Sequence, residues 1–517
     1  MDSRFLAAIG IAPLIAAPQL YARDRNSREG DIRPNIIFFL VDDMGWQDTS
    51  VPFWSERTMY NDRYCTPNME RLADIGVMFT QAYTSSISSP TRCSIMTGAN
   101  AARHRVTNWT LRKGQTTDEA SSTIKIPEWN FNGISQVPGT PNTFTGISFV
   151  QLLKESGYHT IHCGKAHWGA MDTPGENPCH FGFEVNIAGH AAGGLATYLS
   201  ERNFGHDNEG NPVSPFAIPD LREYWGSGTF ATEALTKEAL KALDKAKEYN
   251  QPFYLYMSHY AIHVPIEKDE RYFDKYKAKG LSDKEAAYAS LIEGMDKSLG
   301  DIMDWLEKNG EADNTVIIFM GDNGGYATGT TWRDAPLYTQ NYPLNSGKGS
   351  AYEGGIREPM IVSWPGVAEA GTRCSSYIIA EDLYPTILEM AGIKRYNVPQ
   401  TIDGKSFVPL LKHGSDPSKG RSLYWNCPNI WGEDGPGIGP TCSVRNGDWK
   451  LVYFYESGKK ELYNIKNDIG EKNDISFMHR DIVRKLSKDL GNFLRKSGGQ
   501  RPSFIKTGQP CPWPDEL

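Results

Sequence analysis

The sequence has 517 residues, of which 39% are hydrophobic, and its 54 lysines and arginines against 62 aspartates and glutamates give a net charge of −8 at pH 7. This length suits one large domain plus a smaller one, or three small ones. The acidic balance argues against a nucleic-acid-binding protein, which would normally present a basic face. Eight cysteines without a paired C-x-x-C pattern indicate neither a disulfide scaffold nor a structural zinc site.

The first residues have the pattern of an export signal. Arg4 precedes an apolar run over residues 5–17, and small residues with Tyr21 and Ala22 follow. The run is shorter than the roughly 20 residues that a membrane helix needs. We therefore predict a signal peptide over residues 1–22 and an exported protein without a membrane span. The alternative is a buried N-terminal helix.

Unbroken apolar runs along the chain predict buried strands. They lack alternation, as do parallel strands that are covered on both faces. The runs occupy residues 36–41, 253–257, 316–320 and 360–364. Helical patterns lie between them, over residues 231–249 and from a capping box at 282–285 to about Gly310. Strands that alternate with helices predict an α/β fold.

Polar side chains follow the apolar runs at 36–41, 253–257 and 316–320 and a further predicted strand that ends at Cys163. They are Asp42 and Asp43, Lys165 and His167, His259 and His263, and Asp322 and Asn323. In an open α/β sheet, ligands bind beyond the carboxyl ends of the strands. One such cluster alone could be a polar turn, but the four together favour a common site.

Oxygen ligands predominate in two of these clusters. Asp42, Asp43, Asp322 and Asn323 suit Ca²⁺ or Mg²⁺ better than zinc. Carboxylates packed together also need a cation to offset their repulsion. Asp-Asp and Asp-Asn-Gly are common turn sequences as well, and the choice between calcium and magnesium stays open.

Two longer motifs are more specific. Residues 86–98 read S-I-S-S-P-T-R-C-S-I-M-T-G, and residues 157–167 read G-Y-H-T-I-H-C-G-K-A-H. Together they resemble the two signatures of the type I sulfatases, the first of which is Cys/Ser-x-Pro-x-Arg followed by an apolar pair and Thr-Gly. The resemblance runs from about Pro34 to Asp474 and includes residues 347–349, 353–357, 382–386 and 445–451.

The resemblance implies an alkaline-phosphatase-like α/β domain, with a central, mostly parallel mixed sheet flanked by helices, and a smaller C-terminal domain with an antiparallel sheet and a helix. It implies that Ser88 is oxidised to formylglycine and that Asp42, Asp43, Asp322 and Asn323 bind calcium. Arg92 and Lys165 would hold the formylglycine and the sulfate, with His167 beside them. His263 and Lys348 would contact the sulfate and the leaving oxygen.

The chemistry explains why such a set is needed. A serine hydroxyl is a weak nucleophile without an activating base, whereas an aldehyde hydrate offers one hydroxyl to attack sulfur and another to expel sulfate later. The anionic transition state needs preorganised positive charge, which Arg92, Lys165, Lys348 and the metal would supply. The leaving oxygen needs a proton, which His263 or Lys348 could give. If a helix begins at Ser88, Arg92 lies one turn further on the same face.

Three departures from the family pattern qualify the resemblance. The encoded residue is Ser88 rather than cysteine, which is similar to bacterial sulfatases matured by a radical enzyme. This favours a periplasmic or secreted bacterial protein with a serine-type maturating enzyme as its partner, and predicts that a foreign host leaves Ser88 unmodified. Ala99 stands where relatives often carry arginine, and Ala166 and Trp168 replace more usual neighbours.

Other polar and aromatic residues carry weaker expectations. His104, His159, His162, His190 and His259 could reach the pocket, although a structural role is expected for each. Some loop aromatics could line a glycan subsite: Trp109, Trp129, Tyr224, Trp225, Trp332, Trp425 and Trp431. Cys427 and Cys442, or Cys65 and Cys93, could pair in an oxidising compartment.

The domain boundary is predicted at a linker over residues 412–420. The catalytic domain would span residues 31–415 and the C-terminal domain residues 421–517. The latter contains a hairpin pattern over 449–455 and 460–464 and an amphipathic helix over 482–494.

These patterns predict an enzyme that hydrolyses sulfate monoesters, with a sulfated carbohydrate as its substrate. An O-sulfated galactose or N-acetylhexosamine of a host or algal glycan is our specific expectation. A phosphodiesterase or phosphonate hydrolase of the same fold is the alternative enzyme. The other alternative is an inactive glycan-binding relative.

Overall fold

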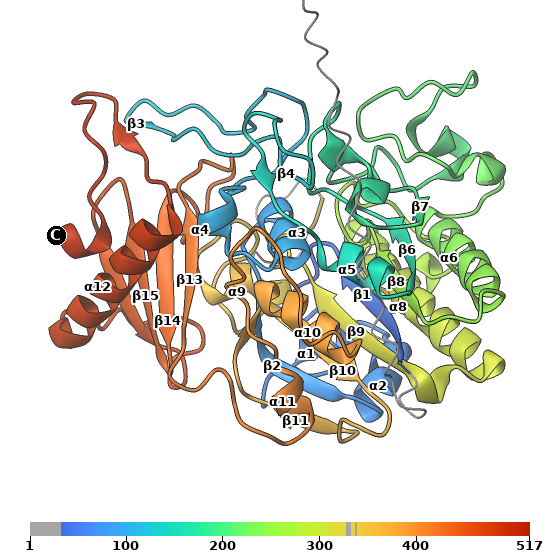
Figure 1. Ribbon diagram of the computed structural model, residues 1–517. Coiled ribbons are helices and arrows are strands. Elements are labelled where there is room, and N and C mark those ends of the chain that lie inside the picture. Colours follow the sequence, from blue (N-terminus) through green and yellow to red (C-terminus); the bar gives the residue numbers. More distant parts are fainter. Residues whose placement is uncertain (1–32, 327–331, 335, 337–338) are drawn as a thin grey trace, which may run out of the picture. The chain divides into compact units, whose positions relative to one another are not determined.

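A nine-stranded, mostly parallel sheet forms the centre of residues 34–517 (Figure 1). Its order is β11-β2-β10-β9-β1-β8-β6-β7, with β12 paired to β2. The strands are β1 (Asn35–Val41), β2 (Val77–Tyr83), β6 (His159–Gly164), β7 (Val185–Ile187), β8 (Phe253–Ser258), β9 (Thr315–Gly321), β10 (Arg357–Ser363), β11 (Thr372–Cys374) and β12 (Ile378–Ile379). This computed structural model describes residues 33–326, 332–334, 336 and 339–517, and the predicted signal peptide over 1–22 lies outside the described residues.

Three of the four predicted parallel strands are confirmed. They form β1, β8 and β9, which lie side by side and run parallel. The fourth, predicted over 360–364, is β10, which runs antiparallel to both β9 and β2. Its predicted direction was wrong because an unbroken apolar run reports burial on both faces, which an antiparallel strand within a covered sheet also experiences.

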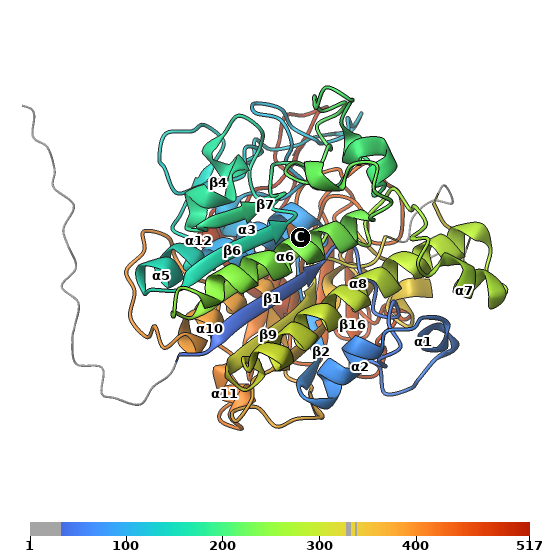
Figure 2. The same ribbon diagram turned by 90° about the vertical axis from the view of Figure 1, so that its right-hand side faces the viewer.

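Helices cover both faces of the sheet (Figure 2). On one face lie α2 (Pro67–Asp74), α6 (Ala231–Lys247) and α8 (Asp283–Asn309), and on the other α3 (Ser88–Thr97), α5 (Phe149–Glu155) and α10 (Leu383–Met390). Strand β1 shows the two-sided packing: Ile37 and Phe39 face the first layer, and Phe38 and Leu40 the second. Side chains that alternate between two cores explain why the strand is apolar throughout.

Helix α8 begins and ends as its sequence predicts. The Ser282 hydroxyl accepts a hydrogen bond from the Glu285 amide, and Gly310 closes the helix in the left-handed conformation. The shorter helices are α1 (Met59–Arg63), α4 (Ala101–His104), α7 (Phe273–Ala278), α9 (Glu353–Ile356) and α11 (Val408–Leu411). Among the described residues, none of the helices combines the length and apolarity that crossing a membrane requires.

An antiparallel sheet forms the C-terminal part of the chain. It comprises β13 (Ser422–Cys427), β14 (Thr441–Asn446), β15 (Trp449–Phe454) and β16 (Lys460–Asn464), and α12 (Arg480–Ser497) packs against it. The predicted hairpin and C-terminal helix are therefore confirmed. The small strands are β3 (Ile124–Lys125), β4 (Ile134–Ser135), β5 (Phe144–Thr145) and β17 (Ser503–Phe504). The domain boundaries at 415 and 421 stay predictions.

The cysteine pairs considered from the sequence do not form. All eight cysteines lie in the described part of the chain and are free thiols. In the β13–β14 ladder, Cys442 lies opposite Asn426 and Cys427 opposite Thr441. Because side chains alternate along a strand, Cys427 and Cys442 point to opposite faces of the sheet.

Candidate active site

The carboxyl ends of four adjacent strands meet at one rim, as the sequence predicts. Asp42 and Asp43 follow β1, Lys165 follows β6, His263 follows β8 and Asp322 follows β9. Gly164, the last residue of β6, has a φ of 100°, and a Cβ there would overlap the Ser258 carbonyl oxygen. Glycine therefore allows β6 to approach β8 closely enough to bring Lys165 to the rim.

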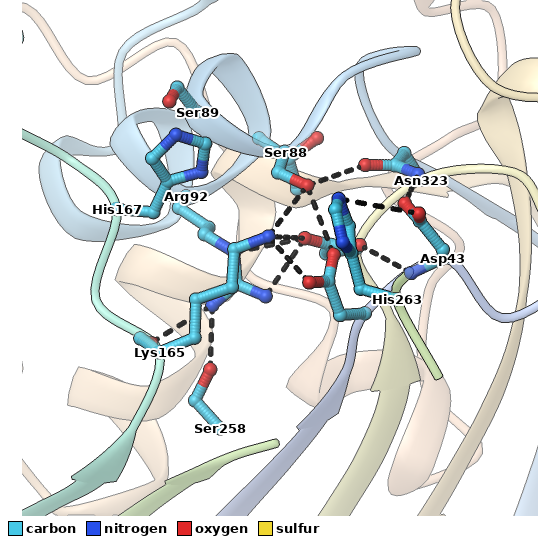
Figure 3. A network of polar contacts seen from close by, with 12 residues as sticks. Asp43, Ser88, Ser89, Arg92, Lys165, His167, Ser258, His263 and Asn323 are labelled. Carbon is cyan, nitrogen blue, oxygen red and sulfur yellow. Dashed lines mark hydrogen bonds and ion pairs between the residues drawn. The ribbon is translucent and has the colours of Figure 1, made fainter. Parts of the chain in front are cut away.

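Ser88 is the first residue of α3, and its side chain lies at the centre of the polar cluster (Figure 3). Its Oγ lies 2.8 Å from Asn323 Oδ1 and 3.2 Å from Asp42 Oδ1, and it accepts a hydrogen bond of 3.1 Å from Lys165 Nζ. The helix has no side-chain N-cap. An uncapped helix N-terminus favours negative charge, so an anion at Ser88 is stabilised by the first turn of α3.

Three buried carboxylates, those of Asp42, Asp43 and Asp322, have oxygens within 4.8 Å of one another. Burial raises the pKa of Asp42 to about 7; Lys165 opposes this, and Asp322 and Asp43 reinforce it. The Asp43 Oδ2 atom is buried without a hydrogen-bond partner. With the Asn323 oxygen beside them, these donors fit a hard divalent cation, which would relieve the repulsion and occupy the unpartnered oxygen.

Three cations surround these carboxylates. Lys165 donates to Asp42 Oδ2 at 2.6 Å, and Lys348 donates to Asp43 Oδ1 at 2.7 Å. Although burial alone would raise it, the pKa of Asp43 is held well below its usual value by Lys348 and His263. Arg92 is one turn after Ser88 in α3, as predicted, and is fully buried.

Arg92 contacts the carboxylate cluster rather than Ser88. Its Nε donates to Asp322 Oδ2 at 2.9 Å, and its Nη1 donates to Ser258 Oγ at 2.6 Å and to the Lys165 carbonyl at 3.1 Å. These contacts fix Asp322 and the segment that carries Lys165.

Two histidines complete the site in their neutral forms. The Nδ1 of His263 donates to the Val264 carbonyl at 2.7 Å, which leaves Nε2 facing Asp43 Oδ2 at 3.7 Å. Burial lowers the pKa of His263 to about 4, and the Lys348 ammonium adds to this effect. The Nε2 of His167 donates to the Thr110 carbonyl at 3.1 Å, and its Nδ1 is buried without a partner.

A cavity of about 350 Å³ opens over Ser88. A volume of this size is typical of small-molecule sites. The sequence-predicted residues that line it are Asp43, Ser88, Trp109, His167, His263, Lys348 and Trp431. Asp42, Arg92, Lys165, Asp322 and Asn323 lie beneath it in the same hydrogen-bonded network.

The other histidines considered from the sequence do not line this cavity. His259, for example, bonds through Nε2 to Ser298 Oγ in the helical layer. Trp129 and Trp425 are buried in the fold instead of lining the site. Ala99, Ala166 and Trp168 are also buried away from the cavity.

Sequence reasoning missed several lining residues. They are Ile87, Glu119, Gly193, Gly194, Phe216, Val264, Tyr326, Gly432 and Glu433. Of these, Ile87 lies within the first signature and Val264 follows His263. Glycine is needed at position 193 because a Cβ there would overlap the His167 ring. The others come from irregular loops whose sequences carry no periodic pattern.

The arrangement defines a class of protein: an enzyme with a central α/β sheet that hydrolyses anionic esters, with a serine at a helix N-terminus beside a cluster of buried carboxylates. The chain belongs to the sulfatase family. A family model described as Sulfatase matches residues 34–393, and one described as N-sulphoglucosamine sulphohydrolase, C-terminal, matches residues 347–496. The protein is therefore a sulfuric ester hydrolase with the predicted alkaline-phosphatase-like fold.

Known relatives match nearly the whole chain. A sulfatase of Formosa agariphila is 28% identical, over 98% of this chain and 95% of the relative. Human N-acetylgalactosamine-6-sulfatase is 26% identical, over 88% of this chain and 84% of the relative. The crystal structure of Ps i-CgsB in complex with k-i-k-neocarrahexaose is 27% identical with a TM-score of 0.70, over 90% of this chain and 93% of that one.

Proposed function

We propose that this protein removes the sulfate group from an O-sulfated sugar, with Ser88 oxidised to formylglycine. The observation that carries this proposal is the position of Ser88 Oγ, which lies at the base of the cavity between Lys165 and the Asp42–Asn323 oxygens. A formylglycine hydrate at position 88 would supply one hydroxyl to attack sulfur as the sugar oxygen leaves, and a second whose deprotonation would expel sulfate and re-form the aldehyde.

Asp42, Asp43, Asp322 and Asn323 would hold calcium, which neutralises the carboxylates and favours an anionic ester. Lys165 would bind the oxygens at position 88, and Lys348 would bind a sulfate oxygen from the cavity wall. Arg92 would act as a positioning residue, because its guanidinium fixes Asp322 rather than reaching the cavity. Preorganised charges of this kind account for much of the stabilisation of an anionic transition state.

The side chain that donates a proton to the leaving oxygen must itself be protonated near neutral pH. The pKa of Lys348 is raised by Asp43 and Asp42 despite burial, so this lysine carries a proton, whereas His263 is neutral. We therefore assign the donation of a proton to the leaving sugar oxygen to Lys348. His167 is assigned no proton transfer, because burial and the nearby Lys165 hold its pKa well below the usual value and its ring lies against Gly193.

A sugar substrate is supported by the aromatic lining of the cavity. Trp109, Phe216 and Trp431 are partly exposed there, as sugar-stacking surfaces would be. Relatives of comparable length include an N-acetylgalactosamine-6-sulfatase and a structure holding a neocarrahexaose. We propose an O-sulfated galactose or N-acetylhexosamine of a host or algal glycan, cleaved in the periplasm or outside a bacterial cell.

The test is production of the protein with and without a serine-type maturating enzyme. Mass spectrometry of the Ser88 peptide should show the loss of two hydrogen atoms only with that enzyme, and sulfate release should follow the modified fraction. Ser88→Ala serves as the inactive control. Modified protein that releases no sulfate from any ester would refute the proposal, and faster cleavage of aryl phosphate than of aryl sulfate would favour a phosphohydrolase.

A further inference from the structure

The outer part of the cavity is acidic, although the substrate is an anion. Two loops form this part, one carrying Glu119 and the other carrying Trp431 and Glu433. The Glu119 amide donates to the Ile430 carbonyl at 3.1 Å, which joins the two loops. We call the carboxylates of Glu119 and Glu433 the acidic wall.

The acidic wall is held in place by its surroundings. Tyr326 donates its hydroxyl to Glu433 Oε1 at 3.1 Å. The Glu119 side chain lies against Gly432, where a Cβ would come within 2.8 Å of Glu119 Cγ. Trp431 packs on the backbone of Gly349, and the ammonium of Lys348 lies 5.8 Å from its ring centre. The wall is thus anchored beside the residue that is expected to bind sulfate.

Positive charge in the cavity is confined to its base. Among the described residues that line it, Lys348 is the only lysine or arginine, and Asp43 already pairs with it at 2.7 Å. A single sulfate group can use Lys348, the helix N-terminus and the cation site. A second anionic group, on the same sugar or its neighbour, would find two carboxylates and no further lysine or arginine in the lining.

We propose that the acidic wall makes this enzyme selective for a sulfate ester whose sugar and neighbouring units are otherwise uncharged. This inference rests on the proposed sulfatase function and assigns Glu119 and Glu433 as specificity residues. Their oxygens accept hydrogen bonds from neutral sugar hydroxyls, and such charge-assisted bonds are strong. They repel carboxylates and additional sulfates at the same positions, since like charges at an interface suppress wrong partners.

The test compares two disaccharides that carry the same single sulfate. In one, the neighbouring sugar is neutral; in the other, its primary hydroxyl is replaced by a carboxylate. The matured wild-type enzyme should show a kcat/KM about tenfold higher for the neutral disaccharide. Glu119→Gln and Glu433→Gln should each reduce this ratio several-fold, because glutamine keeps the shape and removes the charge. The control, Glu248→Gln on the exposed end of α6, should leave the ratio unchanged.

A second measurement needs no variant. Raising the salt concentration should bring the wild-type kcat/KM values for the neutral and the carboxylated disaccharide closer together, because salt screens repulsion from partly exposed carboxylates. Equal kcat/KM for both disaccharides, or a preference that both glutamine variants keep, would overturn the inference while leaving the sulfatase function intact. Failure of the matured enzyme to cleave either disaccharide or an aryl sulfate would overturn both proposals.

Discussion

At the scale of single residues, the site combines buried charges that would destabilise the fold if they were not matched. Asp42, Asp43 and Asp322 are each almost fully buried. Lys165, Lys348 and Arg92 pair with them, yet the pKa of Asp42 still rises to about 7. The remaining repulsion among the three carboxylates is the physical reason to expect a bound cation, whose removal should destabilise the protein.

Chelation with EDTA should lower both the Tm and the sulfatase activity of the matured protein, and added calcium should restore them. Saturating calcium at about a hundred times its Kd would stabilise the fold by about 3 kcal/mol. Calorimetry with calcium and, in parallel, magnesium would measure the effect. Asp43→Asn, which alters the carboxylate with the unpartnered oxygen, should lose most of the response. A Tm that is insensitive to chelator and cation would contradict the predicted site.

Lys348 and His263 are predicted to differ in their dependence on the leaving group. Lys348→Met should lower kcat/KM about 10²–10⁴-fold for a sugar sulfate but less for an activated aryl sulfate, because a phenolate leaves without full protonation. His263→Asn should affect both substrates alike, since its low pKa leaves it neutral at pH 7. Kinetics with leaving groups of graded basicity would measure this. The reverse pattern would make His263 the proton donor.

At the scale of elements, the buried His104 makes the packing of the helices around Ser88 sensitive to pH. His104 ends α4, and its Nδ1 accepts from the Val106 amide at 3.1 Å while its Nε2 bonds to Ser94 Oγ of α3 at 3.0 Å. A proton on Nδ1 would oppose the Val106 donor. Burial lowers the pKa of His104 to about 3, so the folded state keeps it neutral.

The depressed pKa fixes the sign of the pH dependence. Between about pH 6.5 and pH 3 the unfolded chain binds a proton at His104 that the folded protein does not. Stability should therefore be complete above pH 6.5 and fall with acidification, by up to about 1.4 kcal/mol per pH unit from this residue.

Urea unfolding at pH 7 and pH 5 measures this effect. His104→Gln should shrink the difference in unfolding free energy between the two pH values by about 2 kcal/mol. His413→Gln, at an exposed position, is the matched control and should keep the wild-type difference. A variant at His104 with unchanged pH dependence would show that other groups cause the acid sensitivity.

At the scale of the whole molecule, a buried ionic cluster joins the C-terminal sheet to the central one. Lys450 of β15 donates to Glu353 of α9 at 3.0 Å and lies 2.9 Å from a carboxylate oxygen of Glu471. All three side chains are buried. Tyr83 of β2 donates to Glu353 at 2.6 Å, and Arg445 of β14 contacts Tyr83. The C-terminal sheet thereby supports the loop that carries Trp431 and Glu433 into the cavity.

Removing the central cation of this cluster should be costly. Lys450→Met would leave Glu353 and Glu471 buried together, and we expect a loss of about 3–5 kcal/mol of unfolding free energy. Lys459→Met, which removes an exposed lysine that pairs with Glu461, should cost no more than about 1 kcal/mol. Urea unfolding of both variants would measure the difference. If both variants lost similarly little unfolding free energy, the cluster would contribute little to holding the C-terminal sheet on the central sheet.

The sequence predicted much of the framework because its signals are local. The unbroken apolar runs gave β1, β8 and β9, and the capping box and Gly310 gave the ends of α8. The direction of β10 could not be predicted, since a buried strand is apolar whichever way it runs. Likewise, Cys427 and Cys442 stay unpaired because of the register between β13 and β14. The number and spacing of the cysteines in the sequence do not reveal that register.

By itself, the sequence determined the polar residues at the strand ends, the oxygen-rich donor set and the place of Ser88, because each depends on residue type next to a recognisable strand or motif. Only the tertiary structure decided that the Arg92 guanidinium donates to Asp322 and does not line the cavity. It also decided that burial lowers the pKa of His263 and that Glu119 and Glu433 line the same cavity. These features depend on burial and on loops far apart in the chain, and neither leaves a periodic trace in the sequence.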